Sequence, residues 1–133
     1  MGNTGMASKR ILVLDDMLDA VNLIKRILQK EGYEVIGFTE EEEALNYVRT
    51  HPIDLAILDI KLKRISGVEV LEAIKRIDPS TGVIMLTAYP SKQSEQRSIK
   101  LGAGAFCVKP IDNEELVQKV VHVLKPKHTI LNP

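Results

Sequence analysis

Four short apolar runs in this chain each end abruptly in a side chain that can do chemistry. The residues that follow these runs are Asp15 and Asp16, Asp59, Thr87 and Lys109. If the runs are parallel strands of one open sheet, their carboxyl ends lie along one edge, where such sheets bind their ligands. We therefore expect three carboxylates, one hydroxyl group and one ammonium group to converge at that edge.

An acidic cluster of this kind favours a cation. Two carboxylates about 5 Å apart repel by roughly 3 kcal/mol at an effective dielectric constant near 20, and a third adds to the repulsion. Oxygen ligands without histidine or cysteine suit Mg²⁺ or Mn²⁺. A carboxylate nucleophile then forms an acyl phosphate, while the metal, Lys109 and the hydroxyl of Thr87 stabilise the phosphoryl oxygens. The residue types predict a site for phosphoryl transfer.

Each of these residues also has an ordinary structural interpretation. Asp15 and Asp16 could cap the helix that follows them, and Asp59 could cap a turn. Thr87 could simply end a strand, and Lys109 could be a solvated surface residue. Their joint placement at four matching strand ends makes coincidence a poor explanation.

The elements that must position these residues alternate between strands and helices. Short apolar runs predict strands at 11–14, 35–38, 53–58, 83–86 and 105–108. Three- and four-residue spacing predicts helices at about 17–31, 39–52, 70–77, 91–100 and 112–124. Unbroken apolar strands joined by helices indicate an α/β fold, in which helices cover both faces of a parallel sheet.

Three local features refine this picture. Gly37 interrupts the second run, which indicates an edge strand at 35–38. Thr39 and Glu42 have the spacing of a capping box at the start of the second helix. The helix at 91–100 is almost wholly polar, and we expect it to be loosely held because packing of an apolar face supplies most helical stability.

Composition limits the partners of the chain. Lys plus Arg equals Asp plus Glu at 18 each, so no global field favours nucleic acid or an anionic membrane. No apolar run approaches the ~20 residues of a membrane span. The single cysteine, Cys107, lies in an apolar stretch and is expected to be a buried thiol in the reducing cytoplasm.

The chain is expected to form one domain at 9–126. Residues 1–8 indicate a disordered tail or an expression remnant, and residues 127–133 a C-terminal tail or the start of a linker. The motifs within the domain are Ile-Leu-Val-Leu-Asp-Asp at 11–16, Asp-Leu-Ala-Ile-Leu-Asp at 54–59, Ile-Ser-Gly at 65–67, Met-Leu-Thr-Ala at 85–88 and Val-Lys-Pro at 108–110. With these motifs the chain resembles the receiver domain of two-component response regulators, of the chemotaxis-regulator type. The resemblance implies a flavodoxin-like, doubly wound, five-stranded parallel sheet with strand order 2-1-3-4-5.

The resemblance also implies roles for the acidic residues. Asp59 would accept a phosphoryl group from a histidine kinase or a histidine phosphotransfer protein. Asp16 would bind Mg²⁺ directly and Asp15 through a water molecule. Asp59 and the backbone carbonyl of Lys61 would complete the protein ligands of the metal.

The remaining site residues follow from the same resemblance. Thr87 and Lys109 would bind the phosphoryl oxygens, with a cis peptide bond before Pro110 directing the lysine. Phe106 matches the aromatic residue that turns inward when Thr87 moves. The face formed by the helix at 91–100, the fifth strand and the last helix is the expected partner surface.

Two departures from the family pattern bear on the lifetime of the phosphoryl group. The pair Leu62-Lys63 stands where the family usually has Met-Pro, so the loop beside Asp59 is unusually basic. Tyr89 places a bulky ring at the mouth of the expected site. We hypothesise that Tyr89 and Lys61 restrict the attacking water and make the phosphoryl group long-lived.

The function predicted is therefore a phosphoacceptor signalling domain in a phosphorelay, not a turnover enzyme. Its partners would be the phosphodonor and either a downstream protein or a fused output domain, with no direct binding of nucleic acid or membrane. It would act as a monomer or as a phosphorylation-dependent homodimer.

Three alternatives stay open. A metal-dependent aspartyl phosphotransferase usually needs a second aspartate where Lys61 stands. A flavin-binding domain would want a phosphate-cradling loop where Asp15 and Asp16 repel phosphate. A scaffold of the same fold that binds proteins without phosphorylation is disfavoured by the intact acidic set.

Overall fold

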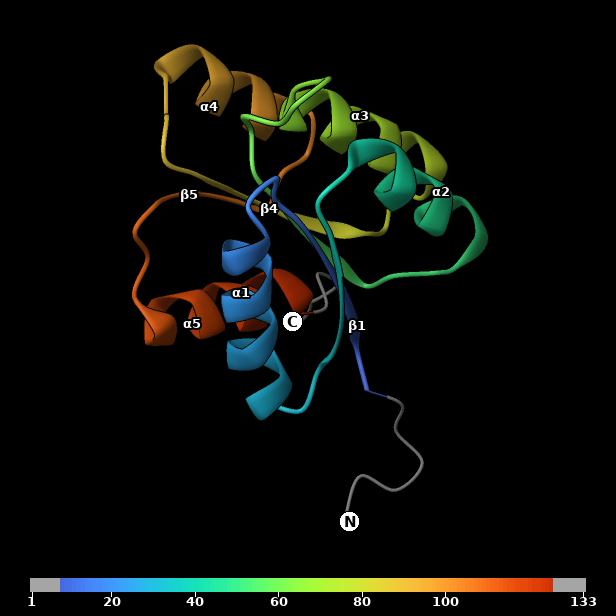
Figure 1. Ribbon diagram of the computed structural model, residues 1–133. Helices are drawn as coiled ribbons and strands as arrows, with labels where there is room; N and C mark the ends of the chain where they lie inside the picture. The colour runs from blue at the N-terminus through green and yellow to red at the C-terminus, as the bar shows by residue number, and fades with distance from the viewer. Residues whose placement is uncertain (1–7, 126–133) are drawn as a thin grey trace, which may run out of the picture.

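The computed structural model describes residues 8–125, in which five strands alternate with five helices (Figure 1). The strands are β1 (Arg10–Leu14), β2 (Glu34–Phe38), β3 (Leu55–Leu58), β4 (Gly82–Thr87) and β5 (Ala105–Val108). The helices are α1 (Leu18–Lys30), α2 (Glu41–Thr50), α3 (Gly67–Ile77), α4 (Lys92–Lys100) and α5 (Asn113–Leu124). The predicted C-terminal tail at 127–133, and all of the predicted N-terminal tail except Ser8, lie outside the described residues.

All five strands are parallel and lie in the order β2-β1-β3-β4-β5, which confirms the predicted doubly wound sheet. The edge position of β2 is confirmed as well. The third strand is shorter than predicted, because the ladder with β4 begins at the pair of Leu55 and Gly82. Asp54, just before the strand, also uses its carboxylate to accept the backbone N–H of Arg10 at 2.8 Å.

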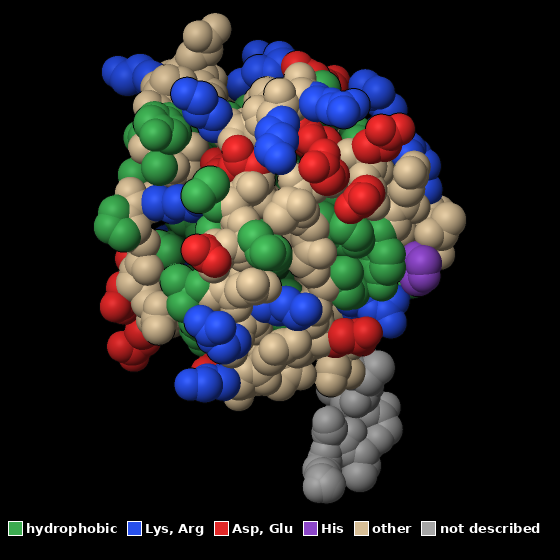
Figure 2. Space-filling view, viewed as in Figure 1, with side chains coloured by type: hydrophobic (Ala, Val, Ile, Leu, Met, Phe, Trp, Pro, Cys, Tyr) green, Lys and Arg blue, Asp and Glu red, His purple; other side chains and the backbone are tan. Residues whose placement is uncertain are grey.

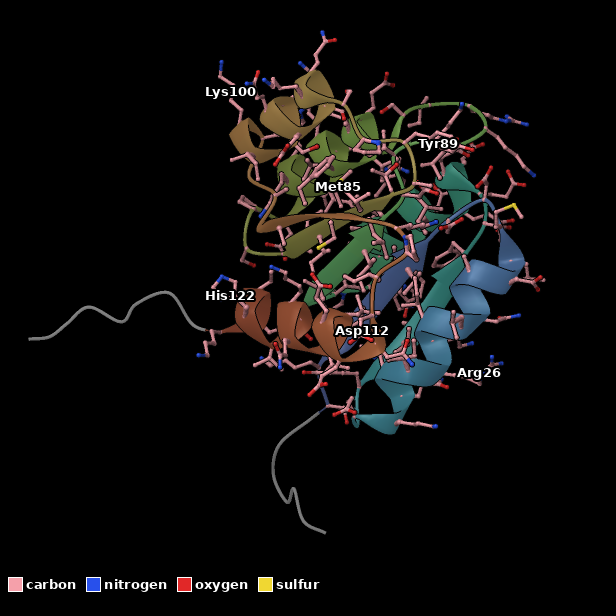
Figure 3. All side chains as sticks on the ribbon, turned by 90° about the vertical axis from the view of Figure 1, so that its left-hand side faces the viewer. Arg26, Met85, Tyr89, Lys100, Asp112 and His122 are labelled. Carbon is pink, nitrogen blue, oxygen red and sulfur yellow. The ribbon has the colours of Figure 1, made fainter. Side chains whose placement is uncertain are left out.

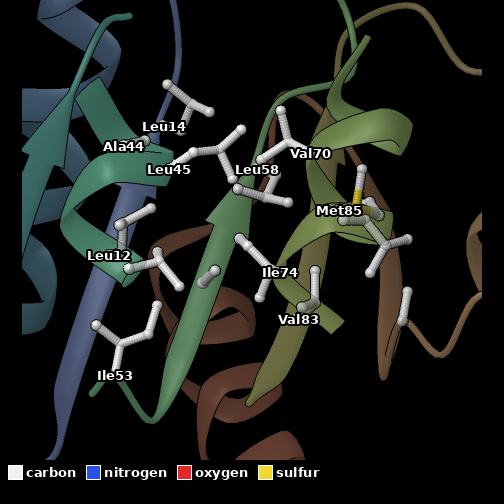
Figure 4. Packing of buried hydrophobic residues seen from close by; sticks show 14 of the residues in the cluster. Leu12, Leu14, Ala44, Leu45, Ile53, Leu58, Val70, Ile74, Val83 and Met85 are labelled. Carbon is white, nitrogen blue, oxygen red and sulfur yellow. The ribbon is translucent and has the colours of Figure 1, made fainter. Parts of the chain in front are cut away.

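Helices cover both faces of the sheet, as Figure 1 shows: α1 and α5 lie on one side, and α2, α3 and α4 on the other. Successive strand residues point to opposite faces, so each strand supplies both cores. Leu12 and Leu14 pack towards α2 and α3 with Leu58 and Met85 (Figure 4). The intervening strand residues pack against α1 and α5, and Cys107 is buried among them as predicted.

The ends of two helices show how local sequence limits the elements. After α1, Gly32 has a φ of 96°, which permits two closing bonds, from its own N–H to the carbonyl of Gln29 and from the N–H of Tyr33 to that of Leu28. This Schellman arrangement fixes the turn into β2. At the start of α2 the predicted capping box is wrong: the N-cap is Glu40, and it makes no side-chain cap hydrogen bond.

Helix α4 is polar and lightly packed, in agreement with the sequence. Its only apolar residue, Ile99, is 51% exposed. A capping box stabilises the N-terminus of α4: the hydroxyl of Ser94 accepts the backbone N–H of Ser91, and the hydroxyl of Ser91 accepts that of Ser94. The hydroxyl of Ser98 is completely buried under the helix, without a hydrogen-bond partner among the described residues.

Charged side chains of both signs are interspersed on the face of the molecule in Figure 2, in line with the balanced composition. Among the described residues, no helix combines the length and the apolar character needed to cross a bilayer.

Candidate functional site

Three carboxylates meet where β1 and β3 end. The last paired residues of these strands are Leu14 and Leu58, so the acids that follow them leave the sheet side by side. Oxygen atoms of Asp15, Asp16 and Asp59 all lie within 4.8 Å of one another. Asp15 is 2% exposed and Asp59 is 8% exposed, whereas Asp16 is half-exposed at the surface. Burial strengthens the repulsion between these charges and increases the demand for a cation.

Lys109 reaches this cluster from the end of β5. Its Nζ lies 2.5 Å from Oδ2 of Asp15 and 3.3 Å from Oδ2 of Asp59. The backbone N–H of Lys109 donates to the carbonyl of Thr87, and the Lys109–Pro110 peptide bond is cis, as the resemblance implied. The structure thus brings the expected ammonium group into contact with two of the three carboxylates.

The charges of this cluster perturb one another. Burial raises the pKa of Asp59, and the neighbouring charge of Asp15 raises it further, while Lys109 offsets only part of the effect. Burial alone would lower the pKa of Lys109, but the hydrogen bond and the charge of Asp15, with those of Asp59, raise it. Lys109 is therefore a firmly charged cation beside an anion that is poorly stabilised.

Thr87 and Phe106 lie on the neighbouring strands β4 and β5. Thr87 is fully buried at the end of β4, and its Oγ1 accepts the N–H of Tyr89 at 3.1 Å. Phe106 pairs with Met85 in the ladder between β4 and β5, and it is half-buried against the core that α2 and α3 cover. Phe106 is thus partly accessible to solvent.

Tyr89 and Lys61, on the loops that follow β4 and β3, contact each other. Tyr89 is 68% exposed at the periphery, whereas Met85 of the preceding strand is in the interior (Figure 3). The Nζ of Lys61 lies 4.6 Å from the centroid of the Tyr89 ring, within the range of a cation–π interaction. The backbone N–H of Lys61 also donates to Oδ1 of Asp59 at 3.3 Å.

The roles of two residues near the site were not predicted from the sequence. A methyl group on Gly67 would overlap the backbone carbonyl of Asp59, so α3 can approach the acidic cluster only with glycine there. Glu41 is buried, and its carboxylate accepts hydrogen bonds from the loop after Asp59. A signal for Glu41 existed, because it lies on the inward stripe that contains Ala44, Leu45 and Val48.

The donor set fits a hard divalent cation. Asp15, Asp16 and Asp59 offer only carboxylate oxygens, the ligands that Mg²⁺ prefers. One lysine offsets only part of the repulsion among the three carboxylates, so excess negative charge is left for a metal ion to neutralise.

Residues 11–121 match the family described as the response regulator receiver domain. The chain belongs to that family. Receiver domains are the phosphoacceptor modules of two-component signalling, so the acidic cluster lies in a domain whose function is to accept a phosphoryl group.

Relatives and solved structures support the assignment of this chain to the receiver-domain family. The chain is 34% identical over 122 residues to sporulation initiation phosphotransferase F of Bacillus subtilis, covering 92% of this chain and 98% of that protein. It is 34% identical over 113 residues to the response regulator GtcR of Aneurinibacillus migulanus, covering 85% of this chain but only 46% of that protein. The receiver domain thus spans about half the length, or less, of several of the regulators that it matches.

The fold of the receiver domain is shared with solved structures. A CheY-like response regulator receiver domain protein from Methanospirillum hungatei superimposes with a TM-score of 0.87 at 35% identity, over 89% of this chain and 94% of that one.

Proposed function

We propose that Asp59 is the carboxylate of this receiver domain that accepts the phosphoryl group. The observation that carries the proposal is the difference between the two buried acids. Asp15 is held by short hydrogen bonds on both oxygens, from the N–H of Met17 at 2.9 Å and from Lys109 at 2.5 Å. The two contacts of Asp59 are 3.3 Å each, and its pKa is raised, chiefly by burial. A carboxylate with long hydrogen bonds and a raised pKa, as Asp59 has, is a better nucleophile than an ordinary carboxylate.

The remaining residues stabilise the transferred group. An oxygen of Asp59 attacks phosphorus, the bond from phosphorus to the donor breaks, and the donor leaves with that electron pair. Lys109 would hold one phosphoryl oxygen, and Thr87 would donate its hydroxyl hydrogen to another. Asp15, Asp16, Asp59 and the carbonyl of Lys61 would hold Mg²⁺, which supplies charge neutralisation at the transferred group.

The donor would be the phosphohistidine of a histidine kinase or of a phosphotransfer protein, and the acyl phosphate would return Asp59 and inorganic phosphate on hydrolysis. The domain acts as a switch in the cytoplasm and catalyses only its own phosphorylation and dephosphorylation. Three exposed apolar side chains support an output surface on α4, β5 and α5. They are Ile99, Val108 and Val121, one on each element.

The contact between Lys61 and Tyr89 would set the lifetime of the phosphoryl group. The Lys61 backbone contacts Asp59, and the cation–π contact of its side chain with Tyr89 joins the two loops that follow β3 and β4; in this proposal both side chains flank the approach to Asp59. Water attacking the acyl phosphate must pass them. Replacing both residues with alanine should accelerate hydrolysis without changing Asp59, and an unchanged hydrolysis rate would refute this role.

Phosphorylation by a small acyl phosphate such as acetyl phosphate tests the proposed function. We expect intact-mass spectrometry to show one added phosphoryl group with Mg²⁺ and none with a chelator. A scaffold that works without phosphorylation would show no added mass in either case. Labelling that persists in the presence of chelator would contradict the metal dependence.

A further inference from the structure

Glu41 is a buried acid that the phosphoryl-transfer chemistry does not use directly. It lies in the first turn of α2 and is only 3% exposed. Its neighbours in the same turn, Glu42 and Glu43, are exposed. Carboxylates are rarely buried unless hydrogen bonds compensate the lost hydration, so the position of Glu41 requires a specific partner.

The partner is the loop that follows Asp59. A single oxygen of Glu41, Oε2, accepts the backbone N–H of Arg64 at 2.6 Å and that of Ile65 at 3.0 Å. Burial of Glu41 acts to raise its pKa, but the hydrogen bonds, led by that from Arg64, outweigh burial and lower it. The carboxylate is thus ionised when it holds the loop, and bonds to a charged acceptor are the strong ones.

The held segment is the same loop that forms one wall of the phosphoryl site. At its start, the N–H of Lys61 donates to Asp59. At its end, the N–H of Gly67 donates to the carbonyl of Ile60 at 2.7 Å, which closes the loop on itself. Glu41 attaches the intervening residues to α2. The peripheral ion pair between Lys63 and Glu40, at 3.8 Å with both side chains well exposed, adds little.

We propose that Glu41 is a positioning residue for phosphoryl transfer, acting through the loop backbone at Arg64 and Ile65. By fixing this loop, Glu41 holds the backbone of Lys61 beside Asp59, where it can serve the metal, and the side chain of Lys61 against Tyr89. This inference rests on the proposed function of Asp59. Helix α2 would then support the site by holding one end of the loop, while Asp59 lies at the other end.

Four variants separate this role from general stability. In Glu41→Leu the side chain fills a similar volume on an apolar stripe but cannot accept hydrogen bonds, so we expect a folded domain without the attachment. In Glu41→Gln one amide oxygen can still accept both N–H groups. Glu42→Ala and Glu43→Ala remove exposed carboxylates of the same turn and serve as matched controls.

Three measurements are made on each variant: amide hydrogen exchange at Arg64 and Ile65, Mg²⁺ affinity by titration, and the phosphorylation rate with acetyl phosphate. Removing a group that orients metal ligands typically costs 10–100-fold in affinity, so we expect a loss of roughly tenfold or more in Glu41→Leu. Its two loop amides should also lose protection. Glu41→Gln should stay within about threefold of the wild type, because a neutral acceptor keeps both bonds but weakens each. The controls should not differ from the wild type.

Wild-type Mg²⁺ affinity and phosphorylation rate in folded Glu41→Leu would overturn the proposal. Equal losses in Glu41→Gln and Glu41→Leu would overturn it too, since the geometry of the acceptor would then be irrelevant. If the wild type itself took no phosphoryl group, that result would contradict the proposed function of Asp59. The amide exchange and the Mg²⁺ titration would still test the positioning role of Glu41.

Discussion

Asp59→Asn should stabilise the metal-free protein, although it removes the proposed nucleophile. At an effective dielectric constant near 20, a carboxylate oxygen no more than 4.8 Å away repels Asp59 by at least ~3.5 kcal/mol, and the Lys109 ammonium at 3.3 Å attracts it by ~5 kcal/mol. Asp15 and Asp16 together therefore outweigh Lys109, although the half-exposed position of Asp16 weakens its share. Burial of the charged form adds to the imbalance, in the direction of the raised pKa of Asp59. We expect a gain of about 1 kcal/mol in the free energy of unfolding.

The assay is urea unfolding followed by circular dichroism at neutral pH in a chelator. The exposed acid Asp112 makes no side-chain cap hydrogen bond, so Asp112→Asn is the control and should change little. Because the folded-state pKa of Asp59 is raised, the destabilisation is present above that pKa and is relieved as the pH falls through it. The advantage of Asp59→Asn should thus shrink on acidification.

Mg²⁺ adds a second test of the same electrostatics. A ligand at a hundred times its dissociation constant stabilises the folded state by ~2.7 kcal/mol, and the wild type should gain more from Mg²⁺ than Asp59→Asn does. If Asp59→Asn were less stable than the wild type in chelator, the reasoning would be refuted. The attraction of Asp59 to Lys109 would then exceed its repulsion by Asp15 and Asp16 and the cost of burying its charge.

Four other substitutions have defined outcomes. Gly67→Ala should lower the free energy of unfolding by ~2 kcal/mol or more and reduce phosphorylation, because the methyl group would overlap the carbonyl of Asp59; Gly32→Ala, strained by its positive φ, should cost ~1–2 kcal/mol and leave phosphorylation unchanged. Ser98→Ala should raise the free energy of unfolding by ~1 kcal/mol in the same urea assay, because it removes a buried hydroxyl that has no hydrogen-bond partner within residues 8–125. The pKa of Glu41 is lowered, so the stability that ionised Glu41 contributes to the folded state is complete above about pH 4.3 and is lost as the pH falls through the folded-state pKa. The difference in the free energy of unfolding between the wild type and Glu41→Gln should therefore narrow in acid. A difference independent of pH would contradict that assignment.

Much of the fold could be predicted from the sequence because buried parallel strands need unbroken apolar runs, and those runs are clear here. The edge position of β2, the polar character of α4 and the burial of Cys107 follow from local composition. The convergence of Asp15, Asp59 and Lys109 followed from one topological rule about strand ends, and the structure shows these side chains in contact.

Contacts between distant segments could not be predicted in the same way. The acidic start of α2 suggested a local capping box, but Glu41 turns to a loop 23 residues away. The contact between Lys61 and Tyr89 depends on the relative positions of two loops, which no spacing rule specifies. The reciprocal cap of Ser91 and Ser94 was missed because a serine stands where the usual pattern has glutamate or glutamine.

The most direct test of the central claim is the location of the phosphoryl group in the labelled protein. After incubation with acetyl phosphate and Mg²⁺, the acyl phosphate is trapped by borohydride reduction and its position is mapped by peptide mass spectrometry. We predict that the reduced residue is Asp59, that Asp59→Asn takes no label, and that Asp54→Asn, beyond the other end of β3, labels normally. Labelling of Asp59→Asn at the wild-type level, or a modified residue at Asp15 or Asp16 in the wild type, would contradict the account.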